Sequence, residues 1–133
     1  VVDEVNMMRR SVKNMRGQAL IEMALVLPIL LALILGIVEF GFLFSTRINM
    51  NNVVRQAVRT AAVSTLSESD LEDNMRADAQ SVGMLGDNIQ ECEIVKGNPN
   101  VIATLRYDAP LITGYIFNVD TIELAAQATM KKE

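Results

Sequence analysis

The chain has 133 residues, with 12 Lys and Arg against 16 Asp and Glu, so its formal net charge is −4. This balance argues against a basic nucleic-acid-binding protein. The chain has no histidine, which excludes the usual proton shuttle. Its single cysteine excludes an internal disulfide and a thiolate metal cluster. Half of the residues are hydrophobic, which is high for a soluble domain of this size. We therefore expect no enzyme, metal, cofactor or nucleic-acid partner, and some apolar surface outside any core.

A long apolar segment lies in the N-terminal third. Between Glu22 and Arg47 the only ionised residue is Glu39. As an α-helix, residues 23–46 would cover roughly 36 Å, enough to cross a hydrocarbon core of about 30 Å. A removable secretory signal is the alternative, but it would have a shorter apolar core of about 7–15 residues and a small-residue cleavage site before Arg47. We predict a membrane span.

The basic residues that flank this span predict its orientation. Basic side chains are denser before it than after it, which favours an N-terminus in the cytoplasm and a C-terminal part across the membrane. Those before the span are Arg9, Arg10, Lys13 and Arg16, and those after it are Arg47, Arg55 and Arg59.

Directly before the span stands the heptapeptide Arg-Gly-Gln-Ala-Leu-Ile-Glu, residues 16–22. Gly17 lacks a Cβ, so the backbone can adopt the extended conformation that a protease needs beside the bilayer. If the Gly17–Gln18 bond were cut, the new α-amino group would lie about one helical turn from Glu22. That ammonium group would offset the roughly 2.5–3.5 kcal/mol that a carboxylate costs at mid-helix in a membrane. Alternatively, Glu22 is an interfacial carboxylate that only snorkels to the surface.

This arrangement resembles a type IV prepilin cleavage site. The segment GQALIEMALVLPILLALILGIVEFGFLF is similar to the N-terminal signature of TadE-like proteins, and the run Val38-Glu39-Phe40-Gly41 and the final segment IELAAQATMKKE add to the likeness. TadE-like proteins are pseudopilins of tight-adherence pili. The resemblance implies a protein of the bacterial inner membrane with a periplasmic head, which reaches the pilus or cell surface after assembly.

The resemblance also implies roles for residues. It implies cleavage after Gly17 by a membrane aspartyl prepilin peptidase, Glu22 as the pilin-type glutamate, and other pilins or pseudopilins as partners in a filament or initiation complex. Gln18 departs from the pattern, because many type IV pilins begin with a methylated phenylalanine. N-methylation is therefore not implied, and this glutamine could instead cyclise. The main subunits of these pili are usually little more than the helix, so the head favours a minor subunit.

Small residues recur at every fourth position of the span. This spacing thins one side of a helix and lets another helix approach closely, and the proline also removes a backbone hydrogen bond. Equally, small residues and proline are simply common in membrane helices. The four residues are Ala24, Pro28, Ala32 and Gly36.

Further along the span, Glu39 has two interpretations: it marks the opposite face of the hydrocarbon layer from Glu22, or it makes a contact between subunits. We expect the aromatic residues here to be lipid or interface anchors rather than a cofactor site: Phe40, Phe42 and Phe44.

Past the span, apolar residues at helical spacing predict that the helix continues to about Ser64. The stripe consists of Met50, Val53, Val54, Ala57, Val58 and Ala61. Ser69 and Glu72 are then expected to form the capping box of a second helix, which ends at Gly83 and has one apolar side. That side consists of Leu71, Met75, Ala79 and Val82. The carboxylates of this helix lack the spacing of a calcium loop, which favours helix capping.

Three strands are expected in the C-terminal half. Residues 88–95 alternate weakly, residues 96–100 form a turn, residues 101–107 complete a hairpin, and residues 121–130 alternate clearly between apolar and polar. The apolar face of this antiparallel sheet needs a cover, which the stripe on the long helix supplies. Cys92 in the first strand is expected to be a buried small hydrophobe rather than a reactive thiol.

The sequence therefore predicts an α+β, pilin-like fold in which a long N-terminal transmembrane helix packs on a small antiparallel sheet with a second short helix. We expect a leader at residues 1–17, the helix at 18–66 and the head at 67–133. The predicted function is a minor pseudopilin that is processed after Gly17 and joins or primes a tight-adherence pilus. The alternative is an uncleaved, single-span binding or sensor module.

Overall fold

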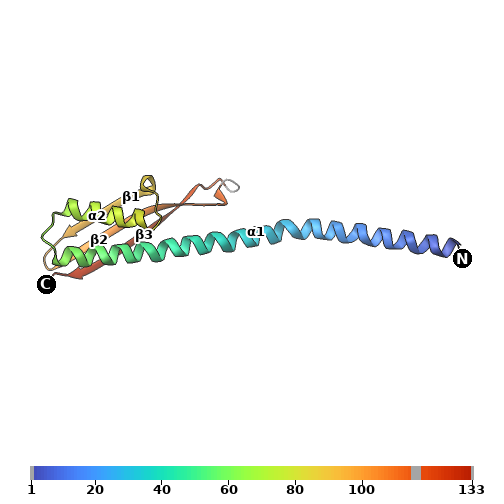
Figure 1. Ribbon diagram of the computed structural model, residues 1–133, viewed down its shortest axis with the longest axis horizontal. Helices are drawn as coiled ribbons and strands as arrows, with labels where there is room; N and C mark the ends of the chain where they lie inside the picture. The colour runs from blue at the N-terminus through green and yellow to red at the C-terminus, as the bar shows by residue number, and fades with distance from the viewer. Residues whose placement is uncertain (1, 115–117, 133) are drawn as a thin grey trace. The chain divides into compact units, whose positions relative to one another are not determined.

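The computed structural model describes residues 2–114 and 118–132, with side chains from Gly17 onward. Helix α1 spans Val2–Val63, helix α2 spans Glu68–Ser81, and a three-stranded sheet follows. This arrangement confirms the predicted α+β class with its long apolar N-terminal helix (Figure 1). The chain divides into two compact units, one ending at Val38 and the other, which we call the head, beginning at Glu39.

The first unit, where its side chains are described, is the apolar part of α1. From Gly17 to Val38 every side chain is exposed. Pro28 lies inside this helix, so the carbonyl of the residue one turn earlier has no helical N–H partner. Apolar side chains exposed on every side of a helix favour apolar surroundings such as lipid or other helices.

The second unit contains the remainder of α1, which is amphipathic. The predicted stripe is confirmed, because all six of its residues are buried: Met50, Val53, Val54, Ala57, Val58 and Ala61. The loop that follows α1 is bound by Lys96, whose ammonium group donates to the carbonyl oxygens of Ser64 at 3.2 Å and Leu66 at 2.6 Å. These bonds join the loop to the end of the strand that contains Lys96.

Helix α2 begins two residues earlier than the capping box predicted. The cap is Ser67, whose hydroxyl accepts from the backbone N–H of Asp70 at 3.2 Å, and the prediction of Ser69 as the cap is wrong. Ser67 and Asp70 satisfy the same cap-to-third-residue spacing, and Asp70 also accepts from the Ser67 hydroxyl. Leu71, Met75 and Ala79 are buried as expected. Val82 is exposed because it forms the C-cap, just before Gly83 adopts a φ of 93° and turns the chain.

The sheet has the strand order β1-β2-β3, and both pairs are antiparallel. Strand β1 spans Ile89–Lys96, β2 spans Asn100–Pro110 and β3 spans Thr121–Lys131, after the short 3-10 helix η1 at Gly86–Asn88. All three strands lie within a few residues of their predicted positions, which confirms the hairpin and the final strand. Strand β2 is central, so β1 and β3 each have one edge without a neighbouring strand.

The core of the head lies between one face of the sheet and the two helices. Alternate residues of β2 are buried on this face: Val101, Ala103, Leu105, Tyr107 and Ala109. Strand β3 contributes less, since Ala126 is buried while Ile122 and Met130 at its ends are exposed. Figure 1 shows α2 running beside the last part of α1, where both helices contribute side chains to this core. The polar face of the sheet therefore points outward, and the open edges of β1 and β3 lie beside the helices.

Candidate functional site

The apolar part of α1 is the first candidate for a functional surface. By length and composition the helix is able to cross a membrane, and its most apolar window has no buried residue. The residues of the small-residue stripe are all exposed: Ala24, Pro28, Ala32 and Gly36. A Cβ built on Gly36 would meet no atom within 4 Å. The exposed stripe is a surface on which another helix or lipid could pack.

The predicted processing residues lie at the start of this surface. Gly17 is inside α1, and a Cβ built on it would meet no atom within 4 Å. Gln18 and Glu22 are one helical turn apart, and the amide Nε2 of Gln18 donates to Glu22 Oε1 at 3.2 Å. Both side chains are exposed. The structure therefore places Gln18 and Glu22 in contact through the glutamine side chain, while the pairing of Glu22 with a new α-amino group stays a prediction.

Glu39, the second predicted assembly residue, has a partner inside the head. Only 8% of the residue is exposed. The backbone N–H of Thr113, in the β2–β3 connection, donates to its Oε1 at 3.0 Å, and the Thr113 hydroxyl donates to its Oε2. A buried carboxylate is stabilised when hydrogen bonds satisfy its oxygens. This contact could not be predicted from the sequence, because the two residues are 74 positions apart and threonine is common in loops.

Exposed aromatic residues surround α1 next to Glu39. Phe40 and Phe44 are 74% and 62% exposed, and Phe42 is 45% exposed. Phe40 and Phe44 point to other sides of the helix than Glu39, which turns toward the β2–β3 connection. Their place beside the apolar segment supports the interpretation as lipid or interface anchors.

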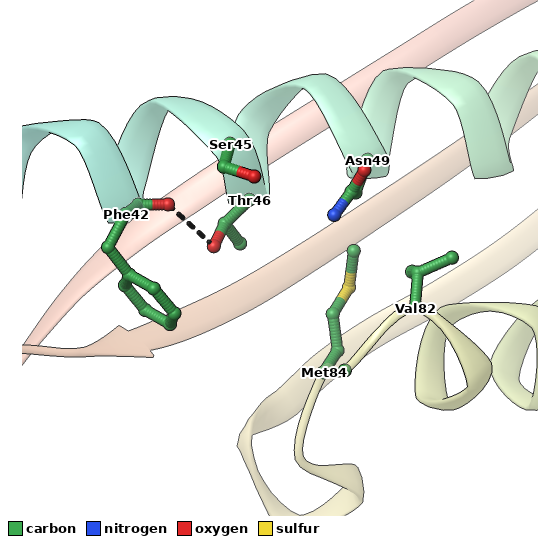
Figure 2. Close-up of a pocket in the computed structure, with 7 residues that line it drawn as sticks. Phe42, Ser45, Thr46, Asn49, Val82 and Met84 are labelled. Atoms are coloured by element: carbon green, nitrogen blue, oxygen red, sulfur yellow. Dashed lines mark hydrogen bonds between the residues drawn. The ribbon is translucent and has the colours of Figure 1, made fainter.

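A small cavity of about 180 Å³ lies in the head between α1 and the segment that follows α2. Figure 2 shows Thr46 and Asn49 on the helix facing Met84, and the Thr46 hydroxyl donating to the carbonyl oxygen of Phe42 at 3.0 Å. This bond satisfies a nearly buried hydroxyl within its own helix. The lining contains no charged side chain, and nothing in it favours catalysis or a charged ligand.

The outer face of the sheet carries an open groove of about 480 Å³ with opposite charges side by side. Arg106 contacts Glu91 at 2.7 Å and Glu123 at 3.5 Å, from the strands on either side of its own. All three side chains are substantially exposed, so each pair contributes little to stability. Because Arg106 offsets one of the two carboxylate charges, the three side chains leave a formal charge of only −1 and no strong field for a ligand.

Charged side chains from the helices bind the open edges of the sheet. On the β1 edge, Glu72 Oε1 accepts from the N–H of Ile94 at 3.0 Å, and Glu68 Oε1 accepts from the N–H of Lys96 at 2.6 Å. On the β3 edge, Arg47 donates to the carbonyl oxygen of Ala125. The sequence assigned the α2 acids to helix capping and missed this role. The available sequence signal for this role was the spacing of Glu68 and Glu72, which lie one turn apart on the helix that precedes β1.

Cys92 is half-buried rather than fully buried, and its thiol donates to the carbonyl oxygen of Glu72 at 3.4 Å. Burial raises the pKa of the Cys92 thiol to about 11, although the positive charge of Arg76 opposes this. A thiol that is neutral near pH 7 is a weak nucleophile. In the part of the chain that the structure describes, no three potential ligands among His, Cys, Asp and Glu gather where they could hold a metal ion.

A protein-family comparison matches the long helix. The family model described as TadE-like protein matches residues 17–59, which include the predicted processing residues, the apolar segment and most of the buried stripe. No curated protein and no solved structure matches the chain. The family indicates a protein related to the tight-adherence pilus. Over residues 17–59, about a third of its length, the chain is similar to TadE-like proteins.

Proposed function

We propose that this protein is a minor pseudopilin of a tight-adherence pilus, cut after Gly17 by a prepilin peptidase and then incorporated into the filament or used to prime it. The observation that carries the proposal is the spacing of Gly17, Gln18 and Glu22 at the start of an exposed apolar helix, inside the segment that matches the TadE-like family. The protein would act as a structural subunit rather than as an enzyme.

Cleavage would change the charge around Glu22. In the uncut chain, Glu22 has a neutral amide partner from Gln18. After the cut, the α-amino group of residue 18 adds a positive charge one turn away, and a charged partner strengthens the hydrogen bond. This partner lowers the cost of placing the carboxylate in lipid or in a bundle of helices.

The position of Gly17 within a helix also favours access by a protease. A glycine inside a helix destabilises it by roughly 0.5–1 kcal/mol relative to alanine. A peptidase that needs an extended peptide would therefore unwind α1 more easily here than elsewhere. In the proposed orientation, the leader lies at the cytoplasmic face of the inner membrane and the head lies in the periplasm.

Assembly would use the exposed part of α1. Its stripe of small residues permits close approach of a second helix, and neighbouring pilin helices would replace the lipid that surrounds the precursor. Glu22 lies at the start of this surface, where its carboxylate would meet an ammonium group of its own or of a neighbouring subunit.

N-terminal sequencing tests the processing step in cells that contain the prepilin peptidase. We expect the mature chain to begin at Gln18, and we expect Gly17→Leu to leave the chain uncut because the added side chain blocks close approach of the peptidase. Gly36→Leu is the matched control and should be processed normally. An unchanged precursor in the unmodified protein would overturn the proposal.

Glu22→Ala separates cleavage from assembly. We expect this variant to be cut normally but recovered from pili in much smaller amounts, because the charge pair at the start of the helix is lost. Normal incorporation of the Glu22→Ala chain into purified pili would contradict the assigned role of the glutamate.

The second candidate function is an uncleaved, single-span binding or sensor module. The observation that favours it is the continuity of α1 through Gly17, together with the partner that Glu22 already has in the uncut chain. Mass spectrometry of the membrane-extracted protein distinguishes the two functions. A population that retains the leader, with no species starting at Gln18, would support the anchor.

A further inference from the structure

The β2–β3 connection lies beside α1 at the end of the head where the apolar segment enters it. We call this end the base: it contains Glu39 on α1, the last residue of β2 and the first residue of β3. Thr113 of the connection binds both carboxylate oxygens of Glu39. Residues Leu111 and Asp120 close the connection, with the N–H of Leu111 donating to the carbonyl oxygen of Asp120 at 3.0 Å. The connection is therefore held next to one identifiable turn of α1.

That turn belongs to the membrane-crossing segment by its composition. A helix needs about 20 residues to cross the hydrocarbon core, and counted from Met23 that length ends at Phe42, with Glu39 as the one ionised residue within it. Glu39 precedes that end. The exposed rings of Phe40 and Phe44 lie on either side of the same boundary. Whatever binds Glu39 must therefore lie at the depth of the lipid surface, not above it.

The side chains that the connection presents there suit a lipid surface. Ile112, the neighbour of Thr113, is 60% exposed although it is a large apolar residue. No charged residue occurs from Leu111 to Gly114. Val119, near the other end of the connection, is exposed as well. An exposed apolar group at this depth gains free energy when lipid rather than water surrounds it.

We propose that the head rests on the bilayer that α1 crosses, with Ile112 and Val119 inserted into the interfacial lipid and the Glu39–Thr113 contact holding them at that depth. The carboxylate of Glu39 is then satisfied by the head and does not need a cation within the lipid. The partner is the phospholipid interface itself, recognised by apolar contact rather than by a specific headgroup. This inference requires that α1 spans a membrane but does not depend on cleavage at Gly17.

The opposite end of the head has a different character. There α1 ends, β1 passes into β2, and the neighbouring side chains are strongly charged: Arg59, Glu68, Asp70, Lys96, Lys131 and Lys132. Val95 is 45% exposed at that end, next to Lys96. It is therefore a matched control, because it is an exposed aliphatic residue of the same domain that should face water.

The test uses the full chain reconstituted at low protein density into phosphatidylcholine–phosphatidylglycerol vesicles. Cys92→Ser removes the native thiol while keeping a hydroxyl that can donate to Glu72. Single cysteines are then introduced as Ile112→Cys, Val119→Cys or Val95→Cys, and each is labelled with a nitrobenzoxadiazole probe. Leu31→Cys, in the apolar part of α1, reports whether the span has inserted.

We expect the probes at positions 112 and 119 to emit at shorter wavelength than the probe at 95, and to be quenched several-fold more strongly by brominated lipids. Because both replaced side chains are exposed, the head should fold with either label, and a thermal melt of each variant checks this. If Ile112→Cys fails to fold, Val119→Cys still tests the same loop.

Two results would overturn the inference. In the first, probes at 112 and 119 behave like the probe at 95 while the probe at 31 is quenched, which would show an inserted span with the head away from the lipid. In the second, the loop probes are shielded from water but not quenched by brominated lipid, which would assign the loop to contact with another protein chain. Both results leave the proposed processing at Gly17 untouched.

Discussion

The two parts of α1 belong to one helix but satisfy their apolar residues in different ways. From Gly17 to Val38, the helix is apolar on every side and no side chain is buried. From Glu39 to Val63, apolar residues are confined mostly to one stripe, which the sheet and α2 cover. The pattern of hydrophobicity around the helix therefore distinguishes two kinds of segment. One needs lipid or neighbouring helices, and the other is buried by the sheet and α2 of the same chain.

The two glutamates of the helix follow the same division. Glu22 is exposed and has only a side-chain neighbour one turn away, whereas Glu39 is almost fully buried and binds a residue far along the chain. The first carboxylate is available to a partner, and the second is committed to the fold. Substitutions of buried residues in the head should therefore lower its free energy of unfolding, and substitutions in the apolar part of α1 should not.

The largest effect is expected from Tyr107→Ala. The ring is fully buried at the centre of β2, and its hydroxyl oxygen accepts from the N–H of Leu85 at 3.3 Å. Removing a large buried ring typically costs about 3–5 kcal/mol. Urea unfolding of the head in detergent, followed by circular dichroism, measures this loss. Leu33→Ala changes an exposed residue of the apolar segment, and an equal loss there would break the comparison between the two parts.

Glu39→Ala should destabilise the head by about 1–3 kcal/mol, because the N–H of Thr113 is left without its acceptor. The β2–β3 connection should also become more sensitive to limited proteolysis. Glu22→Ala is the matched change in the apolar part of the helix and should leave the unfolding midpoint unchanged. The assignment of the two carboxylates fails if both variants unfold at the same urea concentration as the unmodified protein.

A smaller effect is expected from Glu72→Ala, which removes the acceptor for the N–H of Ile94 at the β1 edge. A hydrogen bond of this kind contributes about 1 kcal/mol. The uncovered edge should also promote association between heads, measured by light scattering at high protein concentration. Glu93→Ala, on the outer face of the same strand, is the control. Equal scattering from both variants would argue against a protective role of the α2 carboxylates.

The smallest effect concerns Cys92 and pH. The pKa of its thiol is raised to about 11 because burial disfavours the thiolate. The associated stability is fully present below the ordinary pKa near 9 and is lost as the pH rises through about 11. Maleimide labelling of the folded protein should therefore accelerate mainly above pH 9, whereas urea-unfolded protein should already label readily at pH 8.5. Equal labelling rates of both forms across this range would contradict the buried-thiol assignment.

The parts of the fold that repeat a local pattern could be predicted from sequence. The stripe from Met50 to Ala61 has helical spacing, and the alternation in β2 and β3 marks strands, so these elements needed no knowledge of their neighbours. The cap of α2 was misplaced because Ser67 and Ser69 offer the same chemistry within two positions.

Contacts between distant residues could not be predicted in this way. The bonds from Thr113 to Glu39 and from the strand β1 to the α2 glutamates depend on which side chains the folded sheet brings close. A single sequence specifies the type of each residue but not its distant neighbour. The processing motif at Gly17, Gln18 and Glu22 rests on helical spacing and on the resemblance to prepilin cleavage sites, and it stays a prediction.

The carboxylates that accept from the β1 edge have a consequence for polymer growth. With two of its N–H groups already bound by Glu72 and Glu68, this strand offers fewer free donors to a strand from a neighbouring copy. In the proposed pseudopilin, this protection would hinder crowded precursors from joining sheet to sheet into a disordered deposit. Ordered polymerisation would instead use the exposed apolar part of α1 from Gly17 onward.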